Sequence, residues 1–202
     1  MVKIILEKLK ECYPDSECTL DYAEPWQLLF STRLAAQCTD ERVNKITPAL
    51  YARYNTLEKM SEADINELEE YVRTCGFFRK KAEDLKNCAG ILAKKHGGIL
   101  PNTIEELIKL PGVGRKTANL IMGAVYNMPA IIADTHCIRL SNRFGFVRTN
   151  DPKKVETELK KLIPPKEQTN YCHRCVAHGR AVCKAVNPKC SICELRLICP
   201  KV

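Results

Sequence analysis

The sequence predicts an all-α fold on the strength of two observations. Apolar residues recur at helical spacing in every long segment, and residues that start and stop helices stand between these segments. Neither an alternating strand pattern nor an Asn-Gly hairpin occurs. With 202 residues, the chain has room for one large domain or two small ones.

Three helices are predicted in the first part of the chain. A short amphipathic helix around Ile4–Leu9 ends before Pro14. The apolar cluster after Pro25 predicts a well-buried helix, because proline suits the first helical position. Either Thr39 or Asp40 is placed to cap the third helix.

Two further helices are predicted before residue 100. Ser61 is the expected N-cap of the segment SEADINELEEYV, and Gly76 is the expected left-handed residue where a helix ends. A longer helix over Phe78–His96 then stops at the glycine pair 97–98.

The helices predicted after residue 100 are bounded by caps and prolines. Thr103 opens a capping box at the start of IEELIKL. The Pro-Gly pair 111–112 breaks that helix, and a new one begins near Arg115. Asp151, followed by proline, starts the segment VETELKKLI, which ends at the prolines 164–165.

The net charge of +8 is unevenly distributed along the sequence. Residues 1–78 hold 14 acidic and 9 basic side chains, whereas residues 79–150 hold 5 and 12, and residues 151–202 hold 5 and 11. A basic face built from the later residues would attract a polyanion such as DNA. Charge alone favours the alternative interpretation, a solvated, lysine-rich surface.

The sequence offers no convincing membrane span or leader. The longest uncharged run, Thr117–Ala133, is short and contains two asparagines and a proline. The N-terminal segment mixes charged and apolar residues, unlike a signal or transit peptide. We therefore expect a protein without a membrane partner in the cytoplasm, associated with the nucleoid if the source is bacterial.

A glycine-rich turn, LPGVGRK, joins two of the predicted helices. Gly112 and Gly114 leave the backbone bare, so that amide groups can approach a phosphate closely. The helix that begins beside Arg115 adds its partial positive charge. This arrangement predicts a helix-hairpin-helix that grips the DNA backbone without reading its sequence, although the glycines alone also fit a tight helix connection.

Lys116 and Asp134 are the candidate catalytic residues. A lysine amine at a helix start can act as a nucleophile that forms a Schiff base, although a surface lysine is the default for any single residue. Asp134 follows an apolar stretch and is well placed to be an N-cap. A carboxylate near a deoxyribose would also stabilise the positive charge that develops as a glycosidic bond breaks.

Four of the 12 cysteines crowd the C-terminus with the spacing C-x6-C-x2-C-x5-C. These residues, Cys183, Cys190, Cys193 and Cys199, predict a metal site, because a disulfide framework is unusual in the cytosol. The spacing by itself leaves an iron–sulfur cluster and a zinc ion both open.

These segments together resemble the endonuclease III family of DNA glycosylases. The resemblance rests on LPGVGRKTAN, on ADTH with its aspartate eighteen residues after that lysine, and on LAAQCTDERVNK, CGFFRKKAEDL and HGRAVC. It covers roughly residues 25–202. It implies a base-excision-repair enzyme that removes oxidised pyrimidines from damaged double-stranded DNA and then cleaves the abasic site as a lyase.

The resemblance implies a role for each candidate. Lys116 would attack C1′ of the damaged nucleotide, and Asp134 would be the essential carboxylate. Gln37 would fill the space left by the extruded base, and Phe77 would wedge the neighbouring base steps apart, although the family often has leucine there. His136 would either support the DNA strand or be a buried, hydrogen-bonded histidine.

The resemblance also implies that the four cysteines ligate a [4Fe–4S] cluster. Lys184 and Lys189 lie in the loop after the first ligand and are candidates for phosphate contacts. A further C-x-x-C pair, Cys172 and Cys175, is not part of the family pattern; its spacing favours packing on one face of a helix over redox or metal chemistry.

The family layout implies two all-helical domains with a DNA-binding cleft between them. A six-helix barrel would cover residues 19–128, and a cluster domain would combine residues 1–18 with 129–202. We expect a monomer. Two alternatives remain: a glycosylase without lyase activity, and a non-catalytic DNA-binding protein with a structural zinc site.

Overall fold

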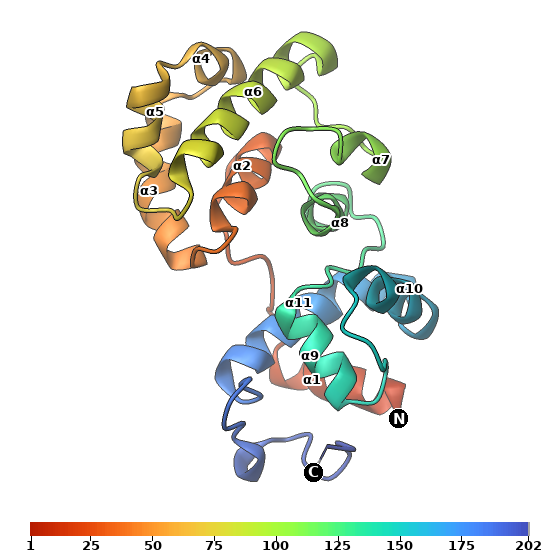
Figure 1. Cartoon of the computed structure of the whole chain (residues 1–202). Helices are drawn as coiled ribbons and strands as arrows, with labels where there is room; N and C mark the ends of the chain where they lie inside the picture. Colours follow the sequence, from red (N-terminus) through yellow and green to blue (C-terminus); the bar gives the residue numbers. More distant parts are fainter. Residues whose placement is uncertain (202) are drawn as a thin grey trace. The chain divides into compact units, whose positions relative to one another are not determined.

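The computed structural model describes residues 1–201, which form helices and connecting loops without a β-strand (Figure 1). The chain divides into two compact units. One is Thr19–Tyr126, here called the hairpin unit. The other combines Met1–Cys18 with Asn127–Val202 and is here called the cysteine unit; its last residue, Val202, lies outside the described residues. The all-α prediction is confirmed.

The hairpin unit contains seven of the helices. They are α2 (Pro25–Ala35), α3 (Asp40–Arg53), α4 (Leu57–Glu62), α5 (Ile65–Val72), α6 (Phe78–His96), α7 (Ile104–Leu107) and α8 (Arg115–Ala124). The longest, α6, packs against α2, α4 and α5. Its inward face carries Leu85, Ala89 and Leu92, all fully buried. Removing each such leucine from water contributes about 2 kcal/mol, so α6 is the centre of this unit.

The cysteine unit is built on four helices and two short 3-10 turns. These are α1 (Val2–Cys12), α9 (Thr135–Arg143), α10 (Pro152–Leu162), η1 (Pro165–Glu167), α11 (Gln168–Ala181) and η2 (Cys190–Ile192). Helix α11 packs against both α1 and α9. Tyr171, on α11, and Phe144, at the end of α9, are the largest fully buried aromatic residues of this unit. A hydrogen bond of 2.8 Å joins the Tyr171 hydroxyl to Ser141 Oγ. This packing holds α9, and with it Asp134, against α11.

Most of the predicted helix starts are confirmed. Pro25 occupies the first turn of α2, and Thr39 rather than Asp40 caps α3. Asp134 and Asp151 cap α9 and α10, and Gly97 ends α6 with a left-handed φ of 58°. These positions depend on local backbone chemistry, which a sequence pattern reads directly.

Ser61 is not an N-cap, so that prediction is wrong. It lies in the last helical turns of α4, a helix capped earlier by Thr56, and its hydroxyl donates to Glu58 O at 2.8 Å. Asp64 caps α5 instead, because its carboxylate accepts from two backbone N–H groups, those of Asn66 and Glu67. Two short helices therefore replace the single predicted one.

The left-handed residue near position 76 is also displaced by one. Phe77 has a φ of 57° and precedes α6, whereas Gly76 does not adopt a positive φ. At Thr103, only half of the predicted capping box forms: its hydroxyl accepts from the Glu106 N–H, while the Glu106 carboxylate pairs with Lys109. The segment IEELIKL accordingly curls into a turn after Leu107.

Helix α11 has no counterpart among the predicted helices. Its buried set includes polar and charged side chains, among them Gln168, Arg174 and His178. These residues are buried because neighbouring elements accept their hydrogen bonds or pair with their charge, as Glu167 does for Arg174 at 2.9 Å. A pattern of apolar residues does not reveal burial of this kind.

The two units divide after Cys18 and after Tyr126. The domains expected from the sequence divide after residues 18 and 128.

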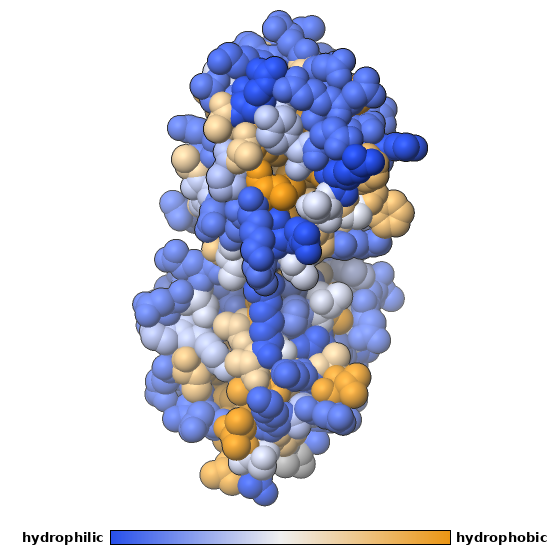
Figure 2. Space-filling view, turned by 90° about the vertical axis from the view of Figure 1, so that its left-hand side faces the viewer, coloured by the Kyte–Doolittle hydropathy of each residue, from blue (hydrophilic) through white to orange (hydrophobic). Residues whose placement is uncertain are grey.

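Within residues 1–201, none of the helices combines the length and the apolar character that a membrane crossing requires. The face of the molecule drawn in Figure 2 is mostly hydrophilic, with small hydrophobic patches.

Candidate functional site

The predicted hairpin joins α7 to α8 in the hairpin unit. Gly112 has a φ of 73°, and a Cβ atom there would lie 2.6 Å from Arg33 Nε. Leu110 and Val113 anchor the turn on either side, with exposures of 4% and 9%. Only glycine therefore fits the tip of this turn, for both conformational and steric reasons.

A buried ion pair lies beneath the tip of the hairpin. The guanidinium of Arg33, on α2, donates to Asp84 Oδ2 on α6 from Nη2 at 2.7 Å and from Nε at 2.8 Å. The Asp84 side chain is only 6% exposed, and Lys80 adds a second cation 3.3 Å from its other oxygen. A two-point guanidinium–carboxylate contact is directional and rigid, so it gives the hairpin a fixed platform. This pair is not among the residues predicted from the sequence, because it joins residues 51 positions apart.

Lys116 is exposed in the first turn of α8. The helix starts after Gly114, a residue without a side chain to cap it, and Arg115 is exposed beside Lys116. Helix N-termini carry a partial positive charge and present N–H groups to anions. The start of α8 thus combines an amine, a guanidinium and backbone amides, a set suited to a phosphate and to a nearby electrophilic carbon.

Asp134 lies at the start of α9 in the cysteine unit and is half-buried. Its Oδ1 accepts the Cys137 backbone N–H at 2.7 Å, which confirms the predicted cap. Residues 130–132 before Asp134 are buried, and the Cys137 N–H after it binds the carboxylate, so the chain holds Asp134 in place on both its N-terminal and C-terminal sides. Burial lowers the pKa of His173, although the negative charges of Asp134 and Glu17 partly oppose this shift.

His136 follows Asp134 and is half-buried against α11. Its Nδ1 lies 3.1 Å from Arg139 Nη2, and Gly179 allows the ring to approach the α11 backbone without a Cβ in the way. Arg139 also donates to Gly179 O and Cys183 O. Of the two interpretations of His136, this geometry favours the buried, hydrogen-bonded one.

Gln37 and Phe77 are brought together in the hairpin unit. Both are exposed, Phe77 by 70%, and both have a left-handed φ of 57°. A Cβ atom added at Gly76, directly before Phe77, would lie 3.8 Å from Gln37 O, so the two loop tips adjoin. Two adjoining loop tips therefore each carry an exposed side chain, one polar and one aromatic.

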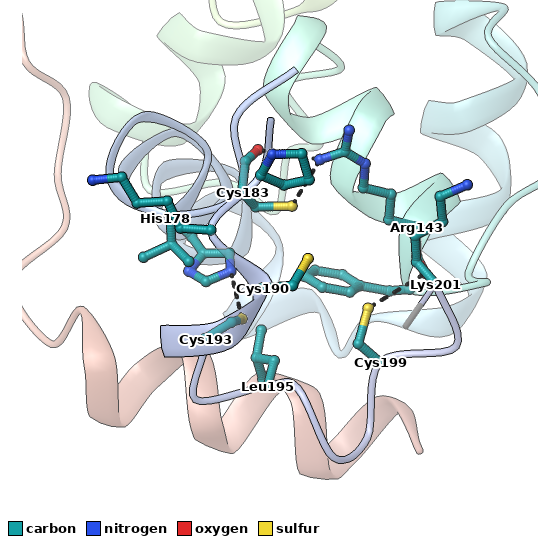
Figure 3. A pocket seen from close by; sticks show the side chains of 12 residues that line it. Arg143, His178, Cys183, Cys190, Cys193, Leu195, Cys199 and Lys201 are labelled. Carbon is teal, nitrogen blue, oxygen red and sulfur yellow. Dashed lines mark hydrogen bonds between the residues drawn. The ribbon is translucent and has the colours of Figure 1, made fainter. Parts of the chain in front are cut away.

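The four clustered cysteines line one cavity in the cysteine unit (Figure 3). Its wall also includes Arg143, Phe144, His178 and Leu195. Within residues 1–201, no three His, Cys, Asp or Glu side chains converge tightly enough to hold one metal ion. Four thiols that line one cavity without converging on one point suit a polynuclear cluster better than a single zinc ion, whose thiolates all lie about 2.3 Å from the metal.

Two side chains beside this cavity hydrogen-bond to the cysteines. Arg143 Nη1 donates to Cys183 Sγ at 3.1 Å, and His178 Nε2 lies 3.6 Å from Cys193 Sγ. Tyr13 OH lies 3.0 Å from the other ring nitrogen of His178. Hydrogen bonds to ligand sulfurs are a common feature of iron–sulfur sites. Neither Arg143 nor His178 is among the residues predicted from the sequence, although the segment HGRAVC contains His178.

The loop that carries Lys184 and Lys189 is held by backbone contacts. Arg143 donates to Lys184 O at 2.8 Å and to Ala185 O at 3.1 Å, and the Lys189 N–H bonds to Val182 O at 3.0 Å. Both lysine side chains are exposed. They are therefore presented to solvent on an ordered loop, where a phosphate could reach them.

Cys172 and Cys175 lie in the core of the cysteine unit rather than beside the cavity. Cys172 Sγ accepts the Ile132 N–H at 3.2 Å and lies 3.9 Å from Cys137 Sγ. Burial raises the pKa of both Cys172 and Cys175, so that they remain thiols. This environment agrees with the packing interpretation of the pair.

Comparisons with known proteins all point in one direction. A family model of the HhH-GPD superfamily of base excision DNA repair proteins matches residues 30–165. Endonuclease III of Synechocystis is 44% identical over 97% of this chain and 90% of its own length. A solved non-covalent endonuclease III–DNA complex has a TM-score of 0.94 and 39% identity, covering 99% of this chain and 94% of that one. A trapped endonuclease III–DNA covalent intermediate has a TM-score of 0.93 and 38% identity, covering 100% and 96%.

Proposed function

Because this chain belongs to the endonuclease III family within the HhH-GPD superfamily, we propose that it removes damaged bases from duplex DNA and cleaves the resulting abasic site. It is a base-excision-repair DNA glycosylase with lyase activity, and oxidised pyrimidines are its proposed substrates. The observation that carries this proposal is an exposed Lys116 in the first turn of α8, directly after the glycine hairpin.

Lys116 is the proposed nucleophile. Its amine attacks C1′ of the damaged nucleotide, a C1′–N bond to the lysine forms, and the glycosidic bond breaks as the base leaves with the electron pair and a proton. The sugar ring then opens to an imine between Lys116 and C1′. Loss of a proton from C2′ expels the 3′ phosphate by β-elimination, and hydrolysis releases the enzyme. The covalent DNA complex of a 38%-identical relative supports a covalent route.

Asp134 is the proposed carboxylate of the reaction. As the glycosidic bond lengthens, positive charge develops on the sugar, and a fixed carboxylate nearby stabilises it. The contact from the Cys137 N–H occupies Oδ1 and orients the group. The N-cap contact and the electrostatic role are compatible, because a carboxylate has two oxygens and several acceptor positions.

The hairpin unit supplies the proposed DNA contacts around the reaction. Backbone amides near Gly112 and Gly114, together with Arg115, would bind phosphates without reading sequence. Gln37 would enter the space left by the extruded nucleotide and Phe77 would wedge the neighbouring base steps apart, and the adjoining positions of their backbones support a joint role. Such contacts suit an enzyme that must recognise damage in any sequence.

Cys183, Cys190, Cys193 and Cys199 are the proposed ligands of a [4Fe–4S] cluster. The bound cluster would cross-link the C-terminal loop and present Lys184 and Lys189 to DNA; it supplies no step of the base-removal chemistry. We further propose that the enzyme works as a monomer on DNA in the cytoplasm or nucleoid.

Borohydride trapping tests the central assignment. The unaltered protein should form a covalent adduct with a duplex that contains one oxidised pyrimidine, because borohydride reduces the imine. Lys116→Ala should bind the same duplex but neither cleave nor cross-link it. Lys109→Ala is the matched control, since Lys109 is exposed near the same hairpin and pairs with Glu106; it should trap normally.

Each contrary outcome selects one alternative. Base release without a trapped adduct would show a glycosylase without lyase activity. Binding without base release, in a colourless protein that contains zinc and lacks iron and sulfide, would show a non-catalytic DNA-binding protein. A panel of duplexes with one defined lesion each would then establish the substrate range.

A further inference from the structure

Gln37 and Phe77 are held in a backbone conformation that neither residue prefers. Both have a φ of 57°, in the left-handed region that favours glycine, and both side chains are exposed. Packing of their own side chains therefore cannot stabilise this conformation. A non-glycine residue persists there only when the surrounding structure holds its backbone in place.

The residue that contacts both loop tips is Lys81, in the first turns of α6. Its backbone N–H bonds to Phe77 O at 3.1 Å, which closes the first turn after the Phe77 tip. Its ammonium donates to Leu34 O at 2.8 Å and to Ala36 O at 2.7 Å, the carbonyls at the end of α2 directly before Gln37. The bond to Phe77 O is the ordinary backbone bond of a first helical turn, whereas the two ammonium contacts are specific to the lysine side chain and tie α6, just after the Phe77 tip, to the chain directly before Gln37.

Lys81 is unusual among the lysines of this chain because it is only 1% exposed. Burying an ammonium group is unfavourable unless its protons are hydrogen-bonded. Here two carbonyls at the C-terminal end of a helix, where the helix dipole is negative, accept from it. The ammonium is therefore directed at the end of α2.

We propose that the Lys81 side chain is a positioning group that fixes the Gln37 tip, beside the Phe77 tip, in the arrangement that enters the gap left by an extruded nucleotide. This inference rests on the proposed function. Insertion into a base stack is more favourable when the inserted group is already ordered, because little conformational freedom is lost on binding. The Lys81 side chain orders the backbone before Gln37 from inside the unit, since it is buried.

Lys86, on the same helix, provides a matched comparison. Its ammonium donates to Ala63 O at 2.7 Å, at the end of α4, so it makes the same kind of contact as Lys81. The residue after Ala63 is Asp64, which caps α5 rather than forming an exposed left-handed tip. Loss of the Lys86 contact should thus weaken the fold without altering insertion into DNA.

The first experiment compares Lys81→Met with Lys86→Met on two substrates. One is duplex DNA with a single oxidised pyrimidine; the other is a single-stranded oligonucleotide with an abasic site, which has no opposite strand. Lys81→Met should lower kcat/KM on the duplex about tenfold or more while keeping borohydride trapping on the single strand within about twofold. Lys86→Met should leave the ratio between the two substrates unchanged.

A fluorescent base analogue, 2-aminopurine, placed opposite the lesion reports insertion directly. Its emission rises when a neighbouring stack is opened, so the unaltered protein should raise it on binding. Lys81→Met should bind with little rise, and Lys86→Met should behave like the unaltered protein. A variant that had merely lost stability would bind less DNA but give the same emission for each bound molecule.

A double-mutant cycle with Gln37→Ala keeps the inference testable even if Lys81→Met folds poorly. If Lys81 acts through Gln37, the loss of duplex activity in the double variant is smaller than the product of the two single losses. Multiplicative losses, or equal losses on duplex and single strand, would overturn the inference. If the unaltered protein trapped neither substrate, the proposed function itself would be wrong.

Discussion

The Asp134 side chain has two roles: it caps the start of α9, and it is the proposed carboxylate of the reaction. Its Oδ1 accepts the Cys137 N–H at 2.7 Å, and the side chain is half-buried. Caps of this kind contribute about 1 kcal/mol to stability. Such a double role predicts that stability and activity can be separated by the choice of substitution.

Asp134→Asn should keep the cap and lose the reaction. Asparagine caps helices about as well as aspartate, but it carries no charge to stabilise the developing cation. We expect the melting temperature to change little and single-turnover base release to fall by about 10²-fold or more. Asp134→Ala should lose the activity and also about 1 kcal/mol of stability.

Asp151 is the control for the capping effect, because it caps α10 in the same unit through the Lys154 N–H at 2.8 Å. Asp151→Ala should cost a similar free energy of unfolding while leaving base release per folded molecule unchanged. Full base release by Asp134→Asn would show that the carboxylate only caps α9.

At the scale of elements, the hairpin between α7 and α8 depends on the two helices beneath it. Arg33 from α2 and Asp84 from α6 form the ion pair against which Gly112 rests. The turn residues predict a hairpin, but its exact path follows from this platform. The α7–α8 connection is thereby coupled to the C-terminal end of α2, which contains Arg33 and leads directly into the Gln37 loop.

Gly112→Ala should distort the hairpin and weaken DNA binding. A methyl group would meet Arg33 Nε at 2.6 Å and Asp84 Oδ2 at 2.8 Å, at a φ of 73°. We expect duplex affinity, measured by fluorescence anisotropy, to fall about tenfold, since ordered backbone amides contribute about 1–2 kcal/mol to anion binding.

Gly97→Ala provides the control for backbone strain. Its φ of 58° is similarly left-handed, but a Cβ there meets nothing within 4 Å. It should lower the stability of the hairpin unit by about 1 kcal/mol without changing affinity for DNA. If both variants bound DNA normally, the hairpin would not be the phosphate-binding element.

At the scale of the whole molecule, the two units contribute different chemistry. The hairpin unit carries Lys116, the glycine turn and the adjoining Gln37 and Phe77 tips; the cysteine unit carries Asp134 and the cysteine-lined cavity. The four clustered cysteines come from one C-terminal stretch and line one cavity. A cluster bound by all four would cross-link that stretch, so its order is expected to depend on the proposed cluster.

Loss of one ligand should remove the cluster and destabilise the cysteine unit. Cys190→Ser should yield protein with little iron or sulfide, a lower melting temperature and weaker DNA binding, because Lys184 and Lys189 lose their ordered loop. Iron and sulfide analysis, visible absorbance and thermal denaturation measure these effects.

Cys172→Ala is the matched control for this prediction. Cys172 is a buried thiol of the same unit that lies outside the cavity wall. The variant should retain a full complement of iron at some cost in stability, since a small core cavity results. Iron loss in Cys172→Ala, or full iron content in Cys190→Ser, would contradict the proposed ligand set.

Local features of this protein were predicted well from the sequence. The helix caps at Thr39, Asp134 and Asp151 and the glycine stop at Gly97 follow from interactions among neighbouring residues. The misplaced cap at Ser61 shows the limit of this approach, because several polar residues in one short segment can serve as caps and packing selects among them.

The sequence by itself determined the helical class, the candidate residues and the family resemblance, because each depends on residue identity and spacing along the chain. Only the tertiary structure showed the Arg33–Asp84 platform, the contact of Lys81 with both loop tips, and the buried polar face of α11. The Arg33–Asp84 pair and the contacts of the Lys81 ammonium join residues more than forty positions apart. A buried charge is tolerated only where its partner lies in space, and that partner is set by packing rather than by the order of residues.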